Sequence, residues 1–225
     1  MSIDTVLFDL DGTLLDSAPL VGRILNGMRE SQRLAPLSLN CYRQWISLGA
    51  ANLVGKAMEA EALSVTTLVQ EFRRRYLELP TPMNTLFPGV TETVAALAAS
   101  GIRLGICSNK PEHLCRKVLL ETGMSNYFGS VVGGDTVSQP KPHRRPLDHA
   151  LKVLGATAPS AILVGDSTVD QRAAHAAQLP FVFFIGGYDD GVDVSAAYSC
   201  IDVVTQVRNI VGKRSGVNLI SKVNK

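Results

Sequence analysis

The sequence predicts an α/β fold, a Rossmann-like core domain built on a parallel sheet, with an all-helical cap domain inserted after the first strand. Short apolar runs alternate with helical patterns along most of the chain, and this alternation is interrupted once, between residues 17 and 82. Strands that alternate with helices of this length form parallel sheets through right-handed crossovers. The chain of 225 residues is long enough for one such core with an insert.

Five apolar runs are expected to be the buried strands. They are mostly rich in β-branched or aromatic residues and end in Gly, Asp, Ser or Asn, as strands do where they enter loops. In chain order they are residues 6–8, 102–107, 131–132, 161–164 and 181–185. The helices expected between them span residues 91–99, 112–121 and 146–154.

The stretch from residue 17 to residue 82 has no convincing strand pattern. Its apolar residues form two stripes at helical spacing, one over residues 20–28 and one over residues 68–77. We therefore expect residues 17–82 to form a helical cap, and residues 1–16 and 83–225 to form the α/β core. The alternative is one continuous domain with additional helices.

Composition excludes several classes of protein. With 46% hydrophobic and 19% charged residues, most of the chain is not disordered. The net charge of +2 is too balanced to indicate nucleic-acid binding. Four widely spaced cysteines, with no C-x-x-C pair, argue against zinc and favour reduced thiols. Because no export signal is recognisable and no apolar run approaches the ~20 residues of a membrane span, we expect a cytoplasmic protein without a membrane partner.

The first chemically informative motif directly follows the first expected strand, where Asp9 and Asp11 precede Gly12 and Thr13. Side chains at i and i+2 of an extended chain face the same side, so the two carboxylates would converge where open α/β sheets bind ligands. Their repulsion favours a nearby cation, and Mg²⁺ prefers such oxygen ligands. Gly12 would let backbone amides approach a bound anion. The alternative is an ordinary Asp-Gly turn.

Polar residues follow other strands in the same way. Asp166 ends the run 161–164 and Asp170 lies one helical turn further on, so the pair could hold a metal or could cap a helix. Ser108 and Asn109 follow the second strand and offer groups suited to phosphate oxygens, or to a local turn. Lys141, between two prolines, is expected on a stiff, extended backbone that aims its charge into a site, although an exposed loop lysine is the default.

These motifs together resemble the haloacid dehalogenase superfamily of phosphotransferases, in the branch with a helical cap after the first strand, and most closely its phosphoglycolate phosphatase-like members. The four motifs all fall on the carboxyl edge of the sheet and occur in the family's order. The matching segments are residues 8–19, 107–111, 141–142 with 146–147, and 164–170. The cap matches only in its helical character and its position.

The resemblance implies a role for each matching residue. Asp9 would attack phosphorus and form an aspartyl-phosphate, while Asp11 would act as general acid and then as general base. Mg²⁺ would lie between the Asp9 carboxylate, the Asp11 carbonyl, Asp166 and the phosphate. The phosphate-binding residues would be Ser108, Asn109 and Lys141, because neutralising charge on the transferring group helps phosphoryl transfer most. The supporting residues would be Gly12, Thr13 and Asp170.

Asp11 also discriminates within the superfamily, because dehalogenases place an aromatic residue there and phosphonate-cleaving members a small apolar one. An acid fits an alcohol leaving group that needs a proton. The resemblance thus implies an Mg²⁺-dependent phosphatase, a monomer or homodimer, acting on a small phosphorylated metabolite such as phosphoglycolate. The alternatives are a phosphomutase, a nucleotidase or a pyrophosphatase of the same superfamily, or a non-catalytic binding module with a disused site.

Two further segments bear on this resemblance. After Asp170 the family usually ends the helix with glycine, whereas this chain has Gln178. If Gln178 adopts a left-handed conformation, the cost is roughly 1 kcal/mol. Residues 186–188, Gly-Gly-Tyr, resemble the Gly-Tyr of phosphoglycolate phosphatases.

Overall fold

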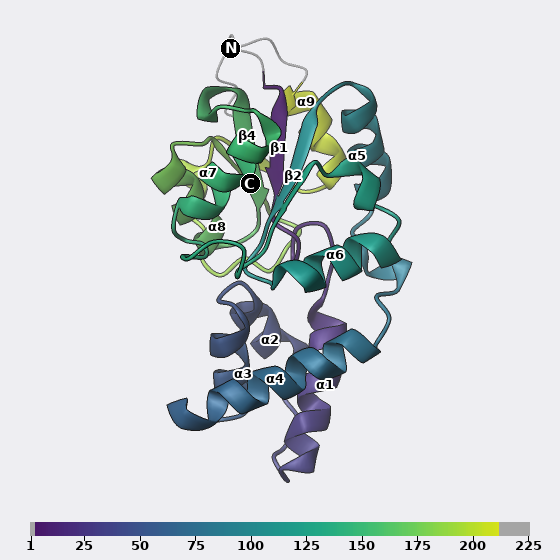
Figure 1. Cartoon of the computed structure of the whole chain (residues 1–225), viewed down its shortest axis with the longest axis vertical. Helices are drawn as coiled ribbons and strands as arrows, with labels where there is room; N and C mark the ends of the chain where they lie inside the picture. Colours follow the sequence, from purple (N-terminus) through teal and green to yellow (C-terminus); the bar gives the residue numbers. More distant parts are fainter. Residues whose placement is uncertain (1–2, 212–225) are drawn as a thin grey trace, which may run out of the picture.

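One parallel sheet forms the centre of the molecule, as a computed structural model shows for residues 3–211. The strand order is β3-β2-β1-β4-β5-β6 (Figure 1). The strands are β1 (Thr5–Phe8), β2 (Arg103–Cys107), β3 (Ser130–Val132), β4 (Ala161–Gly165), β5 (Phe181–Phe184) and β6 (Ser199–Ile201). Because β1 lies between β2 and β4, the segments that follow these three strands meet at one edge of the sheet.

Helices cover both faces of the sheet, which explains why its strands read as continuous apolar runs. Val6 and Phe8 pack in one buried cluster with Val94, and the intervening Leu7 packs in a second cluster with Leu147 and Ala173. Alternate side chains of a strand point to opposite faces, so the two clusters are the two sides of the core. The helices around the sheet are α5 (Val90–Ala99), α6 (Glu112–Glu121), α7 (Arg145–Leu154), α8 (Thr168–Ala177) and α9 (Val207–Val211).

The predicted α/β class is confirmed, and the five expected strands and three expected helices all form, with ends that shift by at most one residue. The sequence analysis missed β6, whose three residues are only partly buried apart from Ile201. It lies at the outer edge of the sheet and pairs with β5 alone among the described strands. A strand this short and half-exposed leaves no apolar run in the sequence.

Four helices occupy the segment in which no strand was expected. They are α1 (Ala18–Ser31), α2 (Leu39–Ile46), α3 (Ala50–Ala57) and α4 (Ala62–Glu78), and we call them the cap helices. Figure 1 shows them grouped beyond one end of the sheet. They share a buried apolar interior that includes Leu25, Tyr42, Val54 and Phe72. We keep the proposal that residues 17–82 form a cap domain on a core of residues 1–16 and 83–225, of which 1–2 and 212–225 lie outside the described residues.

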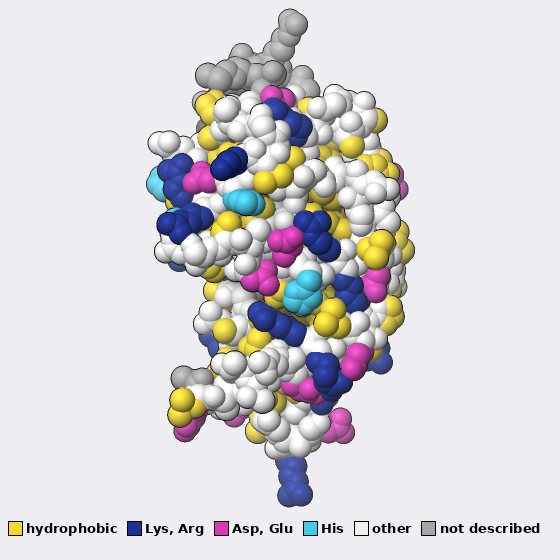
Figure 2. Space-filling model, viewed as in Figure 1, with side chains coloured by type: hydrophobic (Ala, Val, Ile, Leu, Met, Phe, Trp, Pro, Cys, Tyr) yellow, Lys and Arg dark blue, Asp and Glu magenta, His cyan; other side chains and the backbone are white. Residues whose placement is uncertain are grey.

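The surface carries no dominant charge on the face drawn in Figure 2, where acidic and basic side chains are interspersed. This mixture agrees with the net charge of +2. Within residues 3–211, no helix has the length and apolar character needed to cross a membrane.

Gln178 has the left-handed conformation considered from the sequence, with φ 58° and ψ 35°, and it ends α8. Its N–H donates to His175 O at 3.1 Å, and the N–H of Leu179 donates to Ala174 O at 2.9 Å. The backbone therefore forms the helix end that glycine usually provides, at a conformational cost to glutamine.

Replacing this residue with glycine is expected to stabilise the protein. Gln178→Gly should raise the free energy of unfolding by about 1 kcal/mol in urea denaturation, because glycine adopts positive φ without steric penalty. Gly155 is the matched control, since it ends α7 at φ 62° and ψ 36° with open space around a built Cβ atom. Gly155→Gln should destabilise by a similar amount. An unchanged stability of Gln178→Gly beside a destabilised Gly155→Gln would contradict this explanation.

Candidate active site

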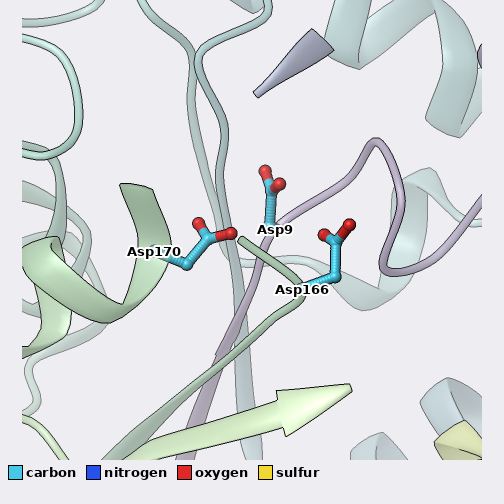
Figure 3. Close-up of side chains that lie close together, drawn as sticks. All are labelled: Asp9, Asp166 and Asp170. Carbon is cyan, nitrogen blue, oxygen red and sulfur yellow. The ribbon is translucent and has the colours of Figure 1, made fainter. Parts of the chain in front are cut away.

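Three buried carboxylates meet at the carboxyl edge of the sheet. Asp9 follows β1, Asp166 follows β4, and Asp170 lies in the first turn of α8 (Figure 3). One oxygen from each of the three lies within 4.8 Å of the others. Their exposed fractions are 4%, 1% and 0%. The adjacency of β1 and β4 brings Asp9 and Asp166 together, although they are far apart in the sequence.

Asp166 is held in place by its neighbours. Its Oδ1 accepts a hydrogen bond from Thr13 Oγ1 at 2.8 Å, and its Oδ2 accepts one from the backbone N–H of Tyr188 at 2.8 Å. Gly12 has φ +83°, and a Cβ atom there would lie 2.2 Å from Asp166 Oδ2. Gly12 therefore allows the first loop to approach Asp166 closely, which only glycine permits at this backbone conformation.

Lys141 lies between two of the carboxylates. Its Nζ is 3.0 Å from Asp9 Oδ1 and 2.5 Å from Asp170 Oδ1, and its side chain is buried. Burial alone would lower the pKa of Lys141, but the carboxylates of Asp170 and Asp9 outweigh it, so that its pKa lies above the usual value. Lys141 lies in a turn closed by a 3.0 Å hydrogen bond from the N–H of His143 to Pro140 O.

Asp170 lies in the carboxylate cluster and also takes part in a helix cap, which was one alternative that the sequence offered. Its Oδ2 accepts a 3.2 Å hydrogen bond from the backbone N–H of Ser167, and its own backbone N–H donates to Ser167 Oγ at 3.3 Å. This reciprocal pairing caps the N-terminus of α8. The other carboxylate oxygen remains for Lys141. The cap of α8 thus fixes the position of a site residue.

The electrostatics of this cluster favour a cation. Burial raises the pKa of Asp9 to about 7, against the opposing attraction of Lys141. Burial also raises the pKa of Asp166, and the charges of Asp170 and Asp9 raise it further. Three carboxylates share the one buried ammonium group of Lys141, so ionising all of them leaves excess negative charge. Oxygen ligands with such an excess fit a hard divalent cation such as Mg²⁺.

The Asp11 carboxylate has a different partner. Both of its oxygens lie 2.9 Å from Lys110 Nζ, and both side chains are buried. The Lys110 ammonium also lies over the ring of Tyr76 from α4, 4.4 Å from the ring centroid. The sequence analysis assigned Lys110 no role. Its position directly after Ser108 and Asn109, at the same edge of the sheet, was the signal that could have identified it.

Ser108 and Asn109 both border the site, but their side chains are used differently. Ser108 is buried, and its Oγ accepts a 3.3 Å hydrogen bond from the N–H of Lys110. Asn109 Nδ2 donates to Ser47 O at 3.1 Å and to Lys141 O at 2.9 Å. Both amide hydrogens of Asn109 therefore bind backbone carbonyls, one from the cap helices and one from the Lys141 turn. Of these two side chains, Ser108 is the one whose donor is not used by a hydrogen bond within residues 3–211.

A small cavity of about 10 Å³ lies between these side chains and the end of α2. Its lining comprises Asp9, Asp11, Ile46, Ser47, Ser108, Asn109, Lys110, Lys141 and Ser167. This volume holds about one water molecule. A larger cavity of about 470 Å³ lies elsewhere, between α5 and α9, and none of the acidic site residues lines it. Asp9 and Asp11 therefore line the smaller cavity and not the larger one.

The cap helices are also joined to the core beside Asp166. Tyr188 OH donates to Asp16 Oδ1 at 2.9 Å and accepts from the N–H of Ala18 at 3.0 Å. Arg43 of α2 forms an ion pair with Asp16 Oδ2 at 2.9 Å. The Gly-Gly-Tyr segment singled out from the sequence thus connects Asp166 to the start of α1.

The molecule combines a parallel sheet, buried carboxylates at the carboxyl edge of that sheet, and helices inserted after the first strand. This combination defines a class of α/β enzymes with a covered acidic centre. The chain belongs to the haloacid dehalogenase-like hydrolases, whose family model matches residues 6–184. The family resemblance drawn from the sequence motifs is therefore confirmed.

Individual relatives extend this match over most of the chain. A phosphoglycolate phosphatase of Xylella fastidiosa is 36% identical over 203 residues, which cover 90% of this chain and 89% of that protein. A phosphoglycolate phosphatase of Rhodospirillum rubrum is 38% identical over 192 residues, which cover 81% of this chain and 80% of that protein. The crystal structure of a predicted phosphoglycolate phosphatase from Haemophilus somnus superposes with a TM-score of 0.84, at 26% identity, over 93% of this chain and 98% of that chain.

Proposed function

We propose that the chain is an Mg²⁺-dependent phosphatase that hydrolyses a small phosphomonoester through an aspartyl-phosphate intermediate, with phosphoglycolate as the leading substrate. The observation that carries this proposal is the position of Asp9, buried at the end of β1 with Lys141 on one side and Asp166 and Asp170 within reach. The similarity to phosphoglycolate phosphatases supports the choice of substrate. We also propose a cytoplasmic location, which the four free cysteines support.

In the first step, a carboxylate oxygen of Asp9 forms a bond to phosphorus and the bond from phosphorus to the leaving oxygen breaks. Asp11 gives its proton to that oxygen, so that an alcohol leaves rather than an alkoxide. In the second step, water attacks phosphorus, Asp11 takes a proton from the water, and the Asp9 carboxylate is released with inorganic phosphate. Each step needs Asp11 close to the atom that gains or loses the proton.

The remaining residues bind charge. Asp9, Asp166 and the backbone carbonyl of Asp11 are the proposed Mg²⁺ ligands, and Asp170 orients Lys141 beside them. When bound, Mg²⁺ supplies positive charge that offsets the charge on the phosphoryl oxygens. Lys141 and the hydroxyl of Ser108 would contact the same oxygens. Asn109, with its amide committed to two carbonyls, would instead hold the cap helices against the Lys141 turn.

The cap helices would exclude water while the phosphoryl group is transferred. Ile46 and Ser47 line the cavity, which has room for about one water molecule and none for a phosphomonoester while the cap helices cover it. A substrate enters only if the cap helices move away from the core, and their return would close the site. A small phosphorylated metabolite fits this enclosure better than a macromolecule.

A phosphatase panel tests the proposal. The purified chain with Mg²⁺ should release free phosphate from phosphoglycolate, and chelation by EDTA should abolish this release. Nucleoside monophosphates, pyrophosphate and sugar phosphates in the same panel identify the other candidate substrates. Isomerised substrate without free phosphate, detected by ³¹P NMR, would indicate a phosphomutase. If no phosphomonoester is hydrolysed and phosphate-mimicking fluoride complexes do not bind, the chain is a non-catalytic module.

A further inference from the structure

We propose that Lys110 is a positioning residue for Asp11 and that Tyr76 shields their ion pair when the cap helices cover the site. The proposal rests on the function proposed above, in which Asp11 transfers protons. It goes beyond that function by assigning roles to a lysine of the core and a tyrosine of the cap helices.

The geometry of the pair is the first observation. Lys110 Nζ lies 2.9 Å from both oxygens of Asp11, and the side chains are only 7% and 9% exposed. Contact with both oxygens fixes the rotation of the carboxylate as well as its position. Among residues 3–211, Lys110 is the one side chain that hydrogen-bonds to this carboxylate. The orientation of the proton-transferring group therefore depends on a residue carried by the segment after β2.

The second observation is the cover over the pair. The Tyr76 ring lies 4.4 Å from Lys110 Nζ, and Tyr76 itself is 1% exposed. An aromatic face attracts a cation and replaces the water that would otherwise surround it. Because Tyr76 lies on α4, movement of the cap helices away from the core would expose the Lys110 ammonium to water. Closure of the cap thus completes the environment of the ion pair.

This arrangement has a chemical consequence. A misplacement of about 1 Å at a reacting group can cost roughly 10²-fold in rate. Loss of Lys110 should therefore slow the step in which the ionised Asp11 takes a proton from the attacking water, because the ion pair exists only while Asp11 is a carboxylate. The attack by Asp9 on a substrate whose leaving group needs no proton should remain fast.

The test compares two substrates, phosphoglycolate and 4-nitrophenyl phosphate, whose nitrophenolate leaves without protonation. Lys110→Met should lower kcat for phosphoglycolate by about 10²-fold, with KM changed by less than about threefold. With 4-nitrophenyl phosphate in stopped flow, it should keep a rapid burst of nitrophenolate equal to one turnover, followed by slow turnover. Lys110→Arg, which restores the cation, should recover part of kcat, and Tyr76→Leu should lower kcat by about tenfold.

Lys117→Met is the matched control, because Lys117 also lies near the Tyr76 ring, at 6.0 Å, but pairs with Glu121. It should keep kcat within about twofold of wild type. If Lys110→Met slows the burst and the turnover equally, or leaves kcat unchanged, Lys110 does not position Asp11. An inactive wild type would instead refute the proposed function, and this inference with it. Circular dichroism on each variant shows whether it is folded. If Lys110→Met does not fold, the kcat values of Lys110→Arg and Tyr76→Leu test the proposal instead.

Discussion

Replacing Asp9 with asparagine is expected to reduce phosphate release from phosphoglycolate by roughly 10⁴-fold or more, the scale found when a covalent nucleophile is removed. The amide cannot supply the anionic oxygen that attacks phosphorus, and it cannot ligate a dication as a carboxylate does. The change is nearly isosteric, and Lys141 keeps its 2.5 Å contact with Asp170. The measurement is free phosphate release, together with mass spectrometry of acid-quenched wild-type enzyme to detect the phosphorylated protein.

The same substitution separates catalysis from stability. Burial raises the pKa of Asp9 to about 7, so the folded protein without metal favours the protonated form. The free energy of unfolding therefore falls as the pH rises from about 4, the pKa of this carboxyl group in the unfolded chain, to about 7, its pKa in the folded protein. Asp9→Asn removes this cost and should be at least as stable as metal-free wild type at pH 8. Asp148→Asn, at an exposed ion pair on α7, is the control and should keep full activity.

Near-equal activity of wild type and Asp9→Asn would exclude Asp9 as the nucleophile. A loss of activity accompanied by an equally large loss of stability would leave the chemical role unsupported. The expected combination is an inactive protein with an unchanged or raised midpoint of unfolding.

The sequence predicted that Asp9 and Asp166 meet at one edge of the sheet, because that prediction needs only local patterns. Asp9 and Asp166 each follow an apolar run, and the carboxyl ends of parallel strands share one edge. A local rule about helix ends likewise raised the left-handed conformation of Gln178 as one possibility, beside a differently built turn, and the structure has the left-handed form. The strand order, which makes β1 and β4 neighbours, does not follow from these patterns.

The partners of individual polar groups could not be read from the sequence. Asn109 has the chemistry of a phosphate ligand, but its amide reaches Ser47 O and Lys141 O, which lie 62 and 32 positions away in the chain. Lysine is usually exposed, so the position of Lys110 after Ser108 and Asn109 could place it near the site but could not identify Asp11 and Tyr76 as its partners. Such contacts depend on how the cap helices rest on the core, which no local pattern encodes.

Replacing Lys141 is expected to change both kcat and the free energy of unfolding, because its Nζ lies 3.0 Å from Asp9 Oδ1 and 2.5 Å from Asp170 Oδ1. Lys141→Met is expected to lower kcat by roughly 10²–10³-fold, since it removes a preorganised positive charge from the transferring phosphoryl group. It should also destabilise the metal-free protein by roughly 3–5 kcal/mol at pH 7, because the buried Asp170 carboxylate loses its cation and Asp9 avoids the same loss only by taking up a proton.

The pH range of this stabilisation follows from the direction of the pKa shift. The folded protein raises the pKa of Lys141 above its unfolded value, so the stabilisation is fully present below that unfolded value, near 10.4, and would be lost only at still higher pH. Urea denaturation at pH 7 therefore measures all of it. The exposed Lys152 provides the control substitution, Lys152→Met, which should leave both quantities unchanged.

Two additions to this experiment identify the cause of the destabilisation. If the unpaired carboxylates are responsible, saturating Mg²⁺ should recover much of the lost stability, because a bound dication offsets their charge. The double variant Lys141→Met with Asp170→Asn should then be less destabilised than the sum of the two single variants, because the second change removes one of the carboxylates that the first leaves unpaired. Additive losses that Mg²⁺ does not relieve would show instead that Lys141 acts through packing, and its assignment to the phosphate-binding charge would then lose its support.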